Sequence, residues 1–316
     1  MRSLKVSPAV LEYAGLVIAL ALLVGLFASK APHFLSIQTV RTIAASVPDA
    51  VFLAVGMTFV LIIAGIDLSV GSVVGLSGAV LGVCLGVWKL PLVPSIMVSL
   101  ATGAACGFLN GLIAERWRLP SFIVTLGTLE MARGGAYLVS GSQTQYVGGP
   151  IERIADASVF GISVPFICCI LAVAVAQFVL LRTVFGRYAI AIGTNEEAVR
   201  LSGINPLPTK IAVFTICGLL ASVAAVMNVS RLASADPNAG TGFELQAIAA
   251  VVIGGTSLMG GRGTVIGSFF GVIIIAVLEN GLAQIGAQEP VKRLATGAVI
   301  ILAVVIDRYR QRLSTA

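Results

Sequence analysis

Charged side chains are scarce in this sequence of 316 residues: they make up 11% of it, whereas apolar side chains make up 58%. A soluble domain carries about a quarter charged residues, so this composition cannot supply a surface that faces water. In a bilayer an apolar exterior is stable because the surrounding solvent is hydrocarbon. The scarcity of charge excludes a soluble globular protein and predicts an integral membrane protein.

Histidine is almost absent, with His33 the single example. One histidine near the end of an apolar run cannot build a Ser-His-Asp set, a Cys-His pair or a metal site of ordinary spacing. The five cysteines all fall inside apolar segments, and we interpret them as small apolar residues packed between helices. We therefore expect no catalytic site, no metal and no cofactor, and the chain is not expected to be an enzyme.

Two signatures of nucleotide and nucleic-acid binding are also missing. The nearest match to a phosphate-binding loop, Gly255–Gly260, continues with Gly261-Arg262 and lacks the lysine that holds the β and γ phosphates. The net charge is +6, but the basic residues are scattered singly between apolar runs without a basic stripe. ATP binding through such a loop and a nucleic-acid partner are both excluded.

Proton coupling is poorly supported, because carriers driven by protons keep acidic groups or histidine inside the membrane. We expect Glu130 to be neutralised by Arg133, which lies one helical turn later. Asp67 either caps the helix that begins near Leu68 or lines a substrate path. The intramembrane carboxylate candidates are Asp67, Glu130, Glu244 and Glu279.

About ten apolar runs approach the roughly 20 residues that a helix needs to cross a bilayer. The predicted spans are 10–29, 46–66, 70–87, 92–114, 121–139, 162–181, 211–229, 243–258, 265–285 and 291–306. The first is longer than the apolar region of a signal peptide, so we expect it to be retained. The breaks at Asp67 and at Gly254-Gly255 suggest broken or re-entrant segments. The predicted fold is a single all-α transmembrane domain over residues 1–316.

Positive charge is distributed unequally between the two sides that this topology defines. The side that carries both termini holds Arg2, Lys5, Arg116, Arg118, Arg182, Arg187, Arg200, Lys210, Arg262, Arg308, Arg310 and Arg312. The other side holds Lys30, Arg41, Lys89, Arg153 and Arg231. Since positively charged loops stay in the cytoplasm, both termini are predicted to be cytoplasmic.

Small and polar residues inside the spans predict how the helices pack. Gly103, Gly107 and Gly111 recur at intervals of four, which places a smooth stripe on one helix face and allows close packing. Neutral polar side chains within spans either bond between helices or contact a polyhydroxyl solute. Together with Asp67, the candidates for a substrate path are Asn110, Asn228, Gln246 and Asn280.

The longest connection, residues 182–208, is predicted to contain a short helix over residues 195–202. Thr194 is expected to cap it, Glu197 to complete a capping box, and Gly203 to end it. So short a helix needs a surface to pack against, which is either its own membrane domain or a cytoplasmic partner. Its side chains form a mixed surface of Ala198, Val199 and Leu201 beside Glu196, Glu197 and Arg200.

Several glycine-rich and polar motifs follow one another along the chain. They are Val55-Gly-Met-Thr58, Gly65-Ile-Asp-Leu-Ser-Val-Gly-Ser72, Phe185-Gly-Arg187, Ala191-Ile-Gly-Thr-Asn-Glu-Glu-Ala198, Leu201-Ser-Gly-Ile204, and Ala249-Ala-Val-Val-Ile-Gly-Gly-Thr-Ser257 with Gly260-Gly261. Taken together, these motifs resemble those of the ribose/xylose/arabinose-type permease subunits of bacterial ABC importers, and the resemblance runs from about Val40 to Arg308.

The resemblance implies a multi-pass permease in the bacterial inner membrane, working as a homodimer or a paralogous heterodimer. It further implies a cytoplasmic ATPase subunit with two cassettes and a periplasmic sugar-binding protein. By the same resemblance, the segment 182–208 supplies the coupling helix, with Thr194, Asn195, Glu196, Glu197, Arg200 and Gly203 at the contact. The open alternatives are a permease for branched-chain amino acids or nucleosides, and a secondary carrier.

Overall fold

The computed structural model describes residues 8–314, and these residues are helical almost throughout. The helices are α1 (Pro8–Lys30), α2 (Ile37–Ile62), α3 (Val70–Gly86), α4 (Leu92–Arg116), α5 (Ser121–Ser140), α6 (Glu152–Asp156), α7 (Val164–Arg182), α8 (Val184–Leu201), α9 (Leu207–Leu232), α10 (Phe243–Ile253), α11 (Val265–Gln284) and α12 (Glu289–Ser314). A 3-10 turn, η1 (Gly149–Ile151), precedes α6. The strands are β1 (Gln145–Tyr146), β2 (Ser158–Val159), β3 (Ile162–Ser163) and β4 (Ser234–Ala235).

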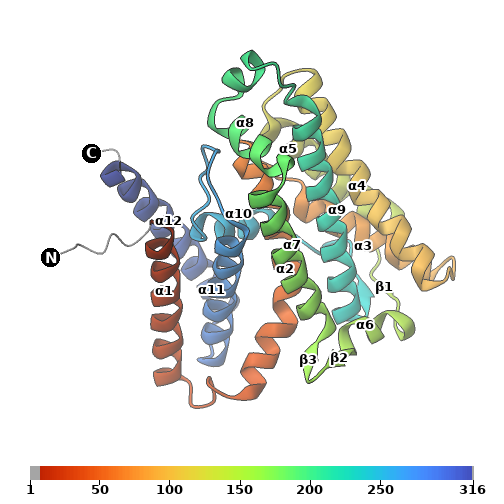
Figure 1. The fold of residues 1–316 in the computed structure, drawn as a ribbon. Coiled ribbons are helices and arrows are strands. Elements are labelled where there is room, and N and C mark those ends of the chain that lie inside the picture. Colours follow the sequence, from red (N-terminus) through yellow and green to blue (C-terminus); the bar gives the residue numbers. More distant parts are fainter. Residues whose placement is uncertain (1–7, 315–316) are drawn as a thin grey trace.

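Among the described residues, six helices are long and apolar enough to cross a membrane, namely α1, α2, α4, α7, α9 and α11. The prediction of a largely helical membrane protein is confirmed. The small strands are an addition to the predicted fold: β1 pairs antiparallel with β4, and β2 with β3. Helix α6 and the β2–β3 hairpin lie at the end of the bundle opposite α8 (Figure 1). The predicted cytoplasmic residues Arg2 and Lys5 lie outside the described residues.

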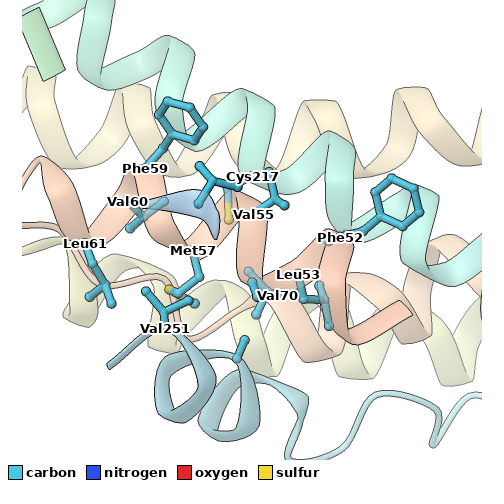
Figure 2. Packing of buried hydrophobic residues seen from close by; sticks show 14 of the residues in the cluster. Phe52, Leu53, Val55, Met57, Phe59, Val60, Leu61, Val70, Cys217 and Val251 are labelled. Carbon is cyan, nitrogen blue, oxygen red and sulfur yellow. The ribbon is translucent and has the colours of Figure 1, made fainter. Parts of the chain in front are cut away.

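Helix α2 runs through the core of the bundle, and almost every side chain from Val47 to Ile62 is buried. Figure 2 shows apolar side chains of α2 packed against Val70 of α3, Cys217 of α9 and Val251 of α10. A helix that is apolar on all faces is stable only where other helices surround it. α2 is therefore a central element that other helices contact along its length.

Helices α4 and α9 approach each other closely through glycine. A Cβ atom built on Gly218 of α9 would lie 2.8 Å from the backbone nitrogen of Gly107 in α4, so no larger residue fits. Gly103 and Gly111 face the same helix, where Ser222 and Ile211 lie against them. The prediction of close packing along this stripe is confirmed, and α4 and α9 form a tightly joined pair.

The chain is not helical between α2 and α3, and side chains of α5 satisfy its backbone. Ser121 Oγ accepts a hydrogen bond from Ile66 N at 2.9 Å. Thr125 Oγ1 accepts from Leu68 N at 3.0 Å and donates to Ile66 O at 3.2 Å. An unwound segment at membrane depth persists only where neighbouring groups replace the lost helical bonds. Helix α5 supplies these bonds, so the break is built into the fold.

The predicted pairing of Glu130 with Arg133 is wrong. Arg133 Nη1 instead donates to the backbone oxygens of Pro237, at 2.7 Å, and Ala239, at 2.9 Å. Both acceptors lie in the connection between β4 and α10, so this arginine fixes the approach to the short helix α10. These two bonds use the donors of Nη1 on neutral carbonyl groups rather than on the carboxylate of Glu130.

Candidate functional site

A cavity of about 340 Å³ opens between α2, α10 and α11, close to the final turn of α9. Its volume lies at the lower end of the range for small-molecule pockets. One part of the wall is apolar, and the rest carries polar and charged side chains. The polar lining residues are Thr42, Ser46, Asp49, Arg231, Gln246, Glu279 and Asn280.

Asp49 is the buried charge of this cavity, only 5% exposed. It follows Pro48, which lies inside α2 and lacks the backbone N–H that a helix would use there. Its Oδ2 accepts hydrogen bonds from Asn228 Nδ2 and from Arg231 Nη2, each at 3.1 Å. The ion pair with Arg231 compensates a carboxylate that would otherwise be costly to bury. The pair joins α2 to the end of α9 beside the cavity.

The opposite wall of the cavity carries amide and carboxylate groups from α10 and α11. Gln246 Nε2 lies 3.4 Å from Glu279 Oε1, and Gln284 Nε2 donates to Asn280 Oδ1 at 2.9 Å. Gln284 also donates to Thr39 Oγ1 at 2.8 Å, near the start of α2. Carboxylates accept hydrogen bonds and amides both donate and accept. The arrangement suits a small solute that carries several hydroxyl groups.

The five predicted substrate-path residues divide into three groups. Gln246 and Asn280 line the cavity. Asn228 is not a lining residue, but it donates a hydrogen bond to Asp49, which is. Asp67 and Asn110 lie apart from the cavity lining, in a network around the break between α2 and α3.

The network around Asp67 and Asn110 is structural. Asp67 Oδ1 accepts from Ser69 N at 2.9 Å and from Ser69 Oγ at 2.6 Å, just before α3 begins. Asn110 Nδ2 donates to the same hydroxyl at 2.9 Å, and its Oδ1 accepts from Thr128 Oγ1 at 2.6 Å. The prediction that Asp67 caps the helix is wrong, because α3 begins at Val70 and Ser69 is at its N-cap position. Asp67 instead accepts from Ser69 N two residues later, as in an Asx turn, and so stabilises the turn before the helix.

Replacing Asn110 with alanine is expected to lower stability without touching the cavity. The change removes the Asn110 donor to the buried Ser69 hydroxyl and the Asn110 acceptor of the partly buried Thr128 hydroxyl. These hydroxyls keep their bonds to Asp67 and to Val124 O, so the loss of two bonds costs about 1–3 kcal/mol in total. The measurement is the thermal midpoint of the purified protein in detergent. Asn280→Ala is the matched control, and it should reduce transport while leaving the midpoint unchanged. Equal midpoints for both variants would contradict the assignment.

The charged residues of the cavity lining, Asp49, Arg231 and Glu279, were not among the predicted path residues, nor were Thr42 and Ser46. Glu279 was noted as an intramembrane carboxylate, whereas Arg231 was assigned only to a loop. The available signal was Asp49 itself, an acidic residue directly after a proline at the start of an apolar run, since ionisable groups inside membranes are usually functional. Its partner Arg231 is 182 residues later in the chain, and the pairing depends on how α9 packs on α2.

The predicted coupling segment is more helical than expected. Helix α8 covers Val184–Leu201, with a kink at Asn195, whose φ of −160° and ψ of 95° are extended. The predicted cap at Thr194 is wrong by one residue: Asn195 Oδ1 accepts the hydrogen bond from Ala198 N at 2.9 Å. Thr194 Oγ1 instead donates to Ile190 O of the preceding turn. The kink thus separates a short terminal helix, residues 196–201, from the rest of α8.

Gly203 ends this short helix as predicted. Its φ is +81°, a conformation that glycine adopts without strain. Gly203 N donates to Arg200 O, and Ile204 N donates to Val199 O, which satisfies the last turn. Residues 196–201 are called the coupling helix below, after the role that the resemblance implies for this segment. Its Leu201 is 83% exposed and its Val199 is buried.

A cluster of four charged side chains holds the coupling helix to the membrane helices. Lys210 Nζ of α9 lies 2.6 Å from Glu115 Oε1 of α4 and 3.0 Å from Glu196 Oε2 of the coupling helix. Arg200 pairs with the other oxygen of Glu196. Partial burial raises the pKa of Glu196, but hydrogen bonds from Lys210 and Arg200 outweigh it and hold that pKa below its ordinary value. Glu196 is therefore ionised at neutral pH.

Comparison with known proteins defines the class. Residues 39–304 match the family described as the permease component of the branched-chain amino acid transport system, and the chain belongs to this family. The match covers every element from α2 to α11. Membership and the six apolar helices make the chain a multi-pass protein of the inner membrane.

Individual relatives are import permeases. The chain is 39% identical to the ribose import permease protein of Escherichia coli over 305 residues, 93% of each chain. It is 37% identical to the ribose import permease protein of Bacillus subtilis, covering 95% of this chain and 94% of the relative. It is 35% identical to the L-arabinose ABC transporter permease protein of Azospirillum brasilense, covering 94% and 88%. No solved structure matches the chain significantly.

Proposed function

We propose that this chain is the membrane permease subunit of an ATP-driven importer for a sugar or a related polyol. The observation that carries the proposal is the cavity lined by Asp49, Arg231, Gln246, Glu279 and Asn280 inside a chain of this family. Its carboxylates and amides match the hydroxyl groups of a sugar. The relatives with sugar names support the same substrate class.

The proposed topology has about ten membrane crossings with both termini in the cytoplasm. To the six long apolar helices it adds α3, α5, α10 and α12, of which α3 and α10 are broken spans. In Figure 1, α1 runs away from the end that carries α8, and α12 runs back toward it. The positive residues Arg116, Arg182 and Arg200 belong to the α8 end. The cavity then faces the periplasmic half.

In this proposal the energy for transport comes from a separate subunit. The coupling helix contacts a cytoplasmic ATPase with two cassettes, and Thr194, Asn195, Glu196, Glu197, Arg200 and Gly203 form or shape that contact. Two copies of the permease, identical or paralogous, share the ATPase, and a periplasmic binding protein delivers the sugar. Closure of the ATPase changes which side of the membrane the cavity faces.

Replacing Glu197 and Arg200 together with alanine is expected to abolish ATP-dependent uptake and to release the ATPase. The reason is that both side chains lie on a short exposed helix whose contacts with a partner are local. Co-purification of the ATPase and uptake of labelled ribose and arabinose into proteoliposomes measure the two effects. The matched control is Glu152→Ala with Arg153→Ala in α6, at the opposite end of the bundle.

Survival of both ATPase association and uptake in the Glu197/Arg200 variant would reject the coupling assignment. Uptake driven by a proton gradient without ATP would favour the secondary carrier. Competition by leucine or by a nucleoside, and none by sugars, would favour the other permease classes.

A further inference from the structure

Helix α9 carries an ion pair at each end, and the two pairs connect different parts of the protein. It is one uninterrupted helix from Leu207 to Leu232. Near its start, Lys210 contacts Glu196 of the coupling helix, and near its end, Arg231 contacts Asp49 in the cavity wall. At 1.5 Å per residue, the two basic residues are about 30 Å apart along the axis. The helix therefore spans the distance from the coupling helix to the cavity.

The contact at Lys210 is well shielded, which makes it stronger than an ordinary surface pair. The side chain of Lys210 is 15% exposed and that of Glu115 is 10% exposed, whereas Glu196 is 33% exposed. One ammonium group is shared by two carboxylates on different elements, so Lys210 joins α4, α9 and the coupling helix. Such a partly buried network resists separation more than a solvated pair does.

The middle of α9 is rigidly packed on both sides. On one side, glycines bring α4 into backbone contact with Gly218. On the other side, Gly56 of α2 faces Cys217, where an added Cβ would lie 3.0 Å from the Cys217 Cα. Close packing of this kind transmits displacement, because interiors have little free volume to absorb it. A movement of the first turn of α9 is therefore carried to its last turn.

We propose that α9 transmits the movement of the coupling helix to the cavity, with Lys210 as the positioning residue that engages it and the Asp49–Arg231 pair as its output. This inference rests on the proposed function. Displacement of Glu196 pulls on Lys210, α9 shifts together with α4, and Arg231 moves relative to the cavity wall. Elements linked by such contacts shift between discrete arrangements.

The test measures access to the cavity in the assembled transporter rather than activity alone. Ser46 lines the cavity, and Ser46→Cys is made in a parent whose five native cysteines are replaced by serine, so that the reaction of position 46 with a membrane-impermeant maleimide reports that access. The rate is compared without nucleotide and with ATP and vanadate, in the full complex in liposomes. The parent is expected to change its rate by about tenfold on nucleotide trapping, within the range of coupling between distant sites.

Lys210→Met is expected to keep the ATPase bound and hydrolysing ATP, but to lose the tenfold change in labelling. Lys210→Arg keeps the charge and should restore it. Lys89→Met is the matched control, because that lysine is exposed between α3 and α4 and belongs neither to the cavity lining nor to the coupling helix. Should Lys210→Met fail to fold, Glu196→Gln gives the second test, since it leaves Lys210 paired with Glu115.

The outcomes separate the two proposals. A parent that binds no ATPase and shows no response to nucleotide would overturn the proposed function. A parent that responds, with Lys210→Met or Glu196→Gln responding equally, would overturn transmission through α9. Release of the ATPase by Lys210→Met would also overturn it, because Lys210 would then shape the docking surface instead.

Discussion

Uptake is expected to fall by about 10- to 100-fold when Asp49 is replaced by alanine. The change leaves the Arg231 guanidinium and the Asn228 amide at the cavity without their shared acceptor. A hydrogen bond to a charged group contributes about 1.5–3 kcal/mol, and each 1.4 kcal/mol corresponds to about tenfold. We expect a fall in uptake of no more than about 100-fold, because Arg231 is partly exposed and water can replace part of the lost hydrogen bonding.

The measurement is the initial rate of sugar uptake into proteoliposomes that contain the full transporter. Asp49→Asn keeps an oxygen acceptor without the charge and should retain more uptake than the alanine variant. Asp156→Ala, at an exposed position of α6, is the matched control for loss of an aspartate. Asp49→Ala with uptake equal to that of Asp156→Ala would show that the pair has no part in the translocation path.

Replacing Gly107 with alanine is expected to give the largest loss of stability. The new Cβ would overlap the backbone oxygen of Phe214 in α9, and backbone cannot move aside as a flexible side chain can. Overpacking costs about 1–3 kcal/mol in ordinary cores, and this site belongs at the upper end. The loss should appear as a lower thermal midpoint and a lower yield of protein in the membrane.

A matched control comes from glycines of α5. Gly127 also lies inside a helix, yet a Cβ built there meets no atom within 4 Å. Gly127→Ala should keep or slightly raise stability, because alanine is about 0.5–1 kcal/mol better than glycine inside a helix. Equal stability of the two variants would mean that α4 and α9 are not as closely packed as described.

The apolar parts of the helices could be predicted from hydropathy. The ends of α2 and α9 could not, because polar residues lie there. The predicted second span begins at Ser46, whereas α2 begins at Ile37. Its first turns contain Thr39, Arg41 and Thr42, which look like a loop to a hydropathy argument although Thr42 lines the cavity. For the same reason the predicted span 211–229 is shorter than α9 at both ends, where Lys210 and Arg231 lie. Polar residues at the cavity and beside the coupling helix lower the hydropathy of the helix ends that carry them, so a hydropathy argument misses those ends.

The candidate site could be predicted only in part. The residue type shows that a side chain is polar, but it does not show whether that side chain faces the cavity or another helix. Gln246 and Asn110 are both amides inside apolar helices. The first lines the cavity, whereas the second bonds to Ser69 and Thr128. Which of these occurs depends on neighbours from distant parts of the chain. The short helix after Asn195 could be predicted more closely, since caps are local: both the helix end at Gly203 and a cap within one residue followed from sequence.

The unwound segment between α2 and α3 has a consequence for how the protein is made. Its backbone groups at Ile66 and Leu68 are satisfied by Ser121 and Thr125, which leave the ribosome more than fifty residues later, at sequence separations of 55 and 57. Until α5 enters the bilayer, the segment has unpaired amides that hydrocarbon does not tolerate. Nascent α3 must therefore wait beside the insertion machinery or at the aqueous interface, and α2 to α5 enter the membrane as a group.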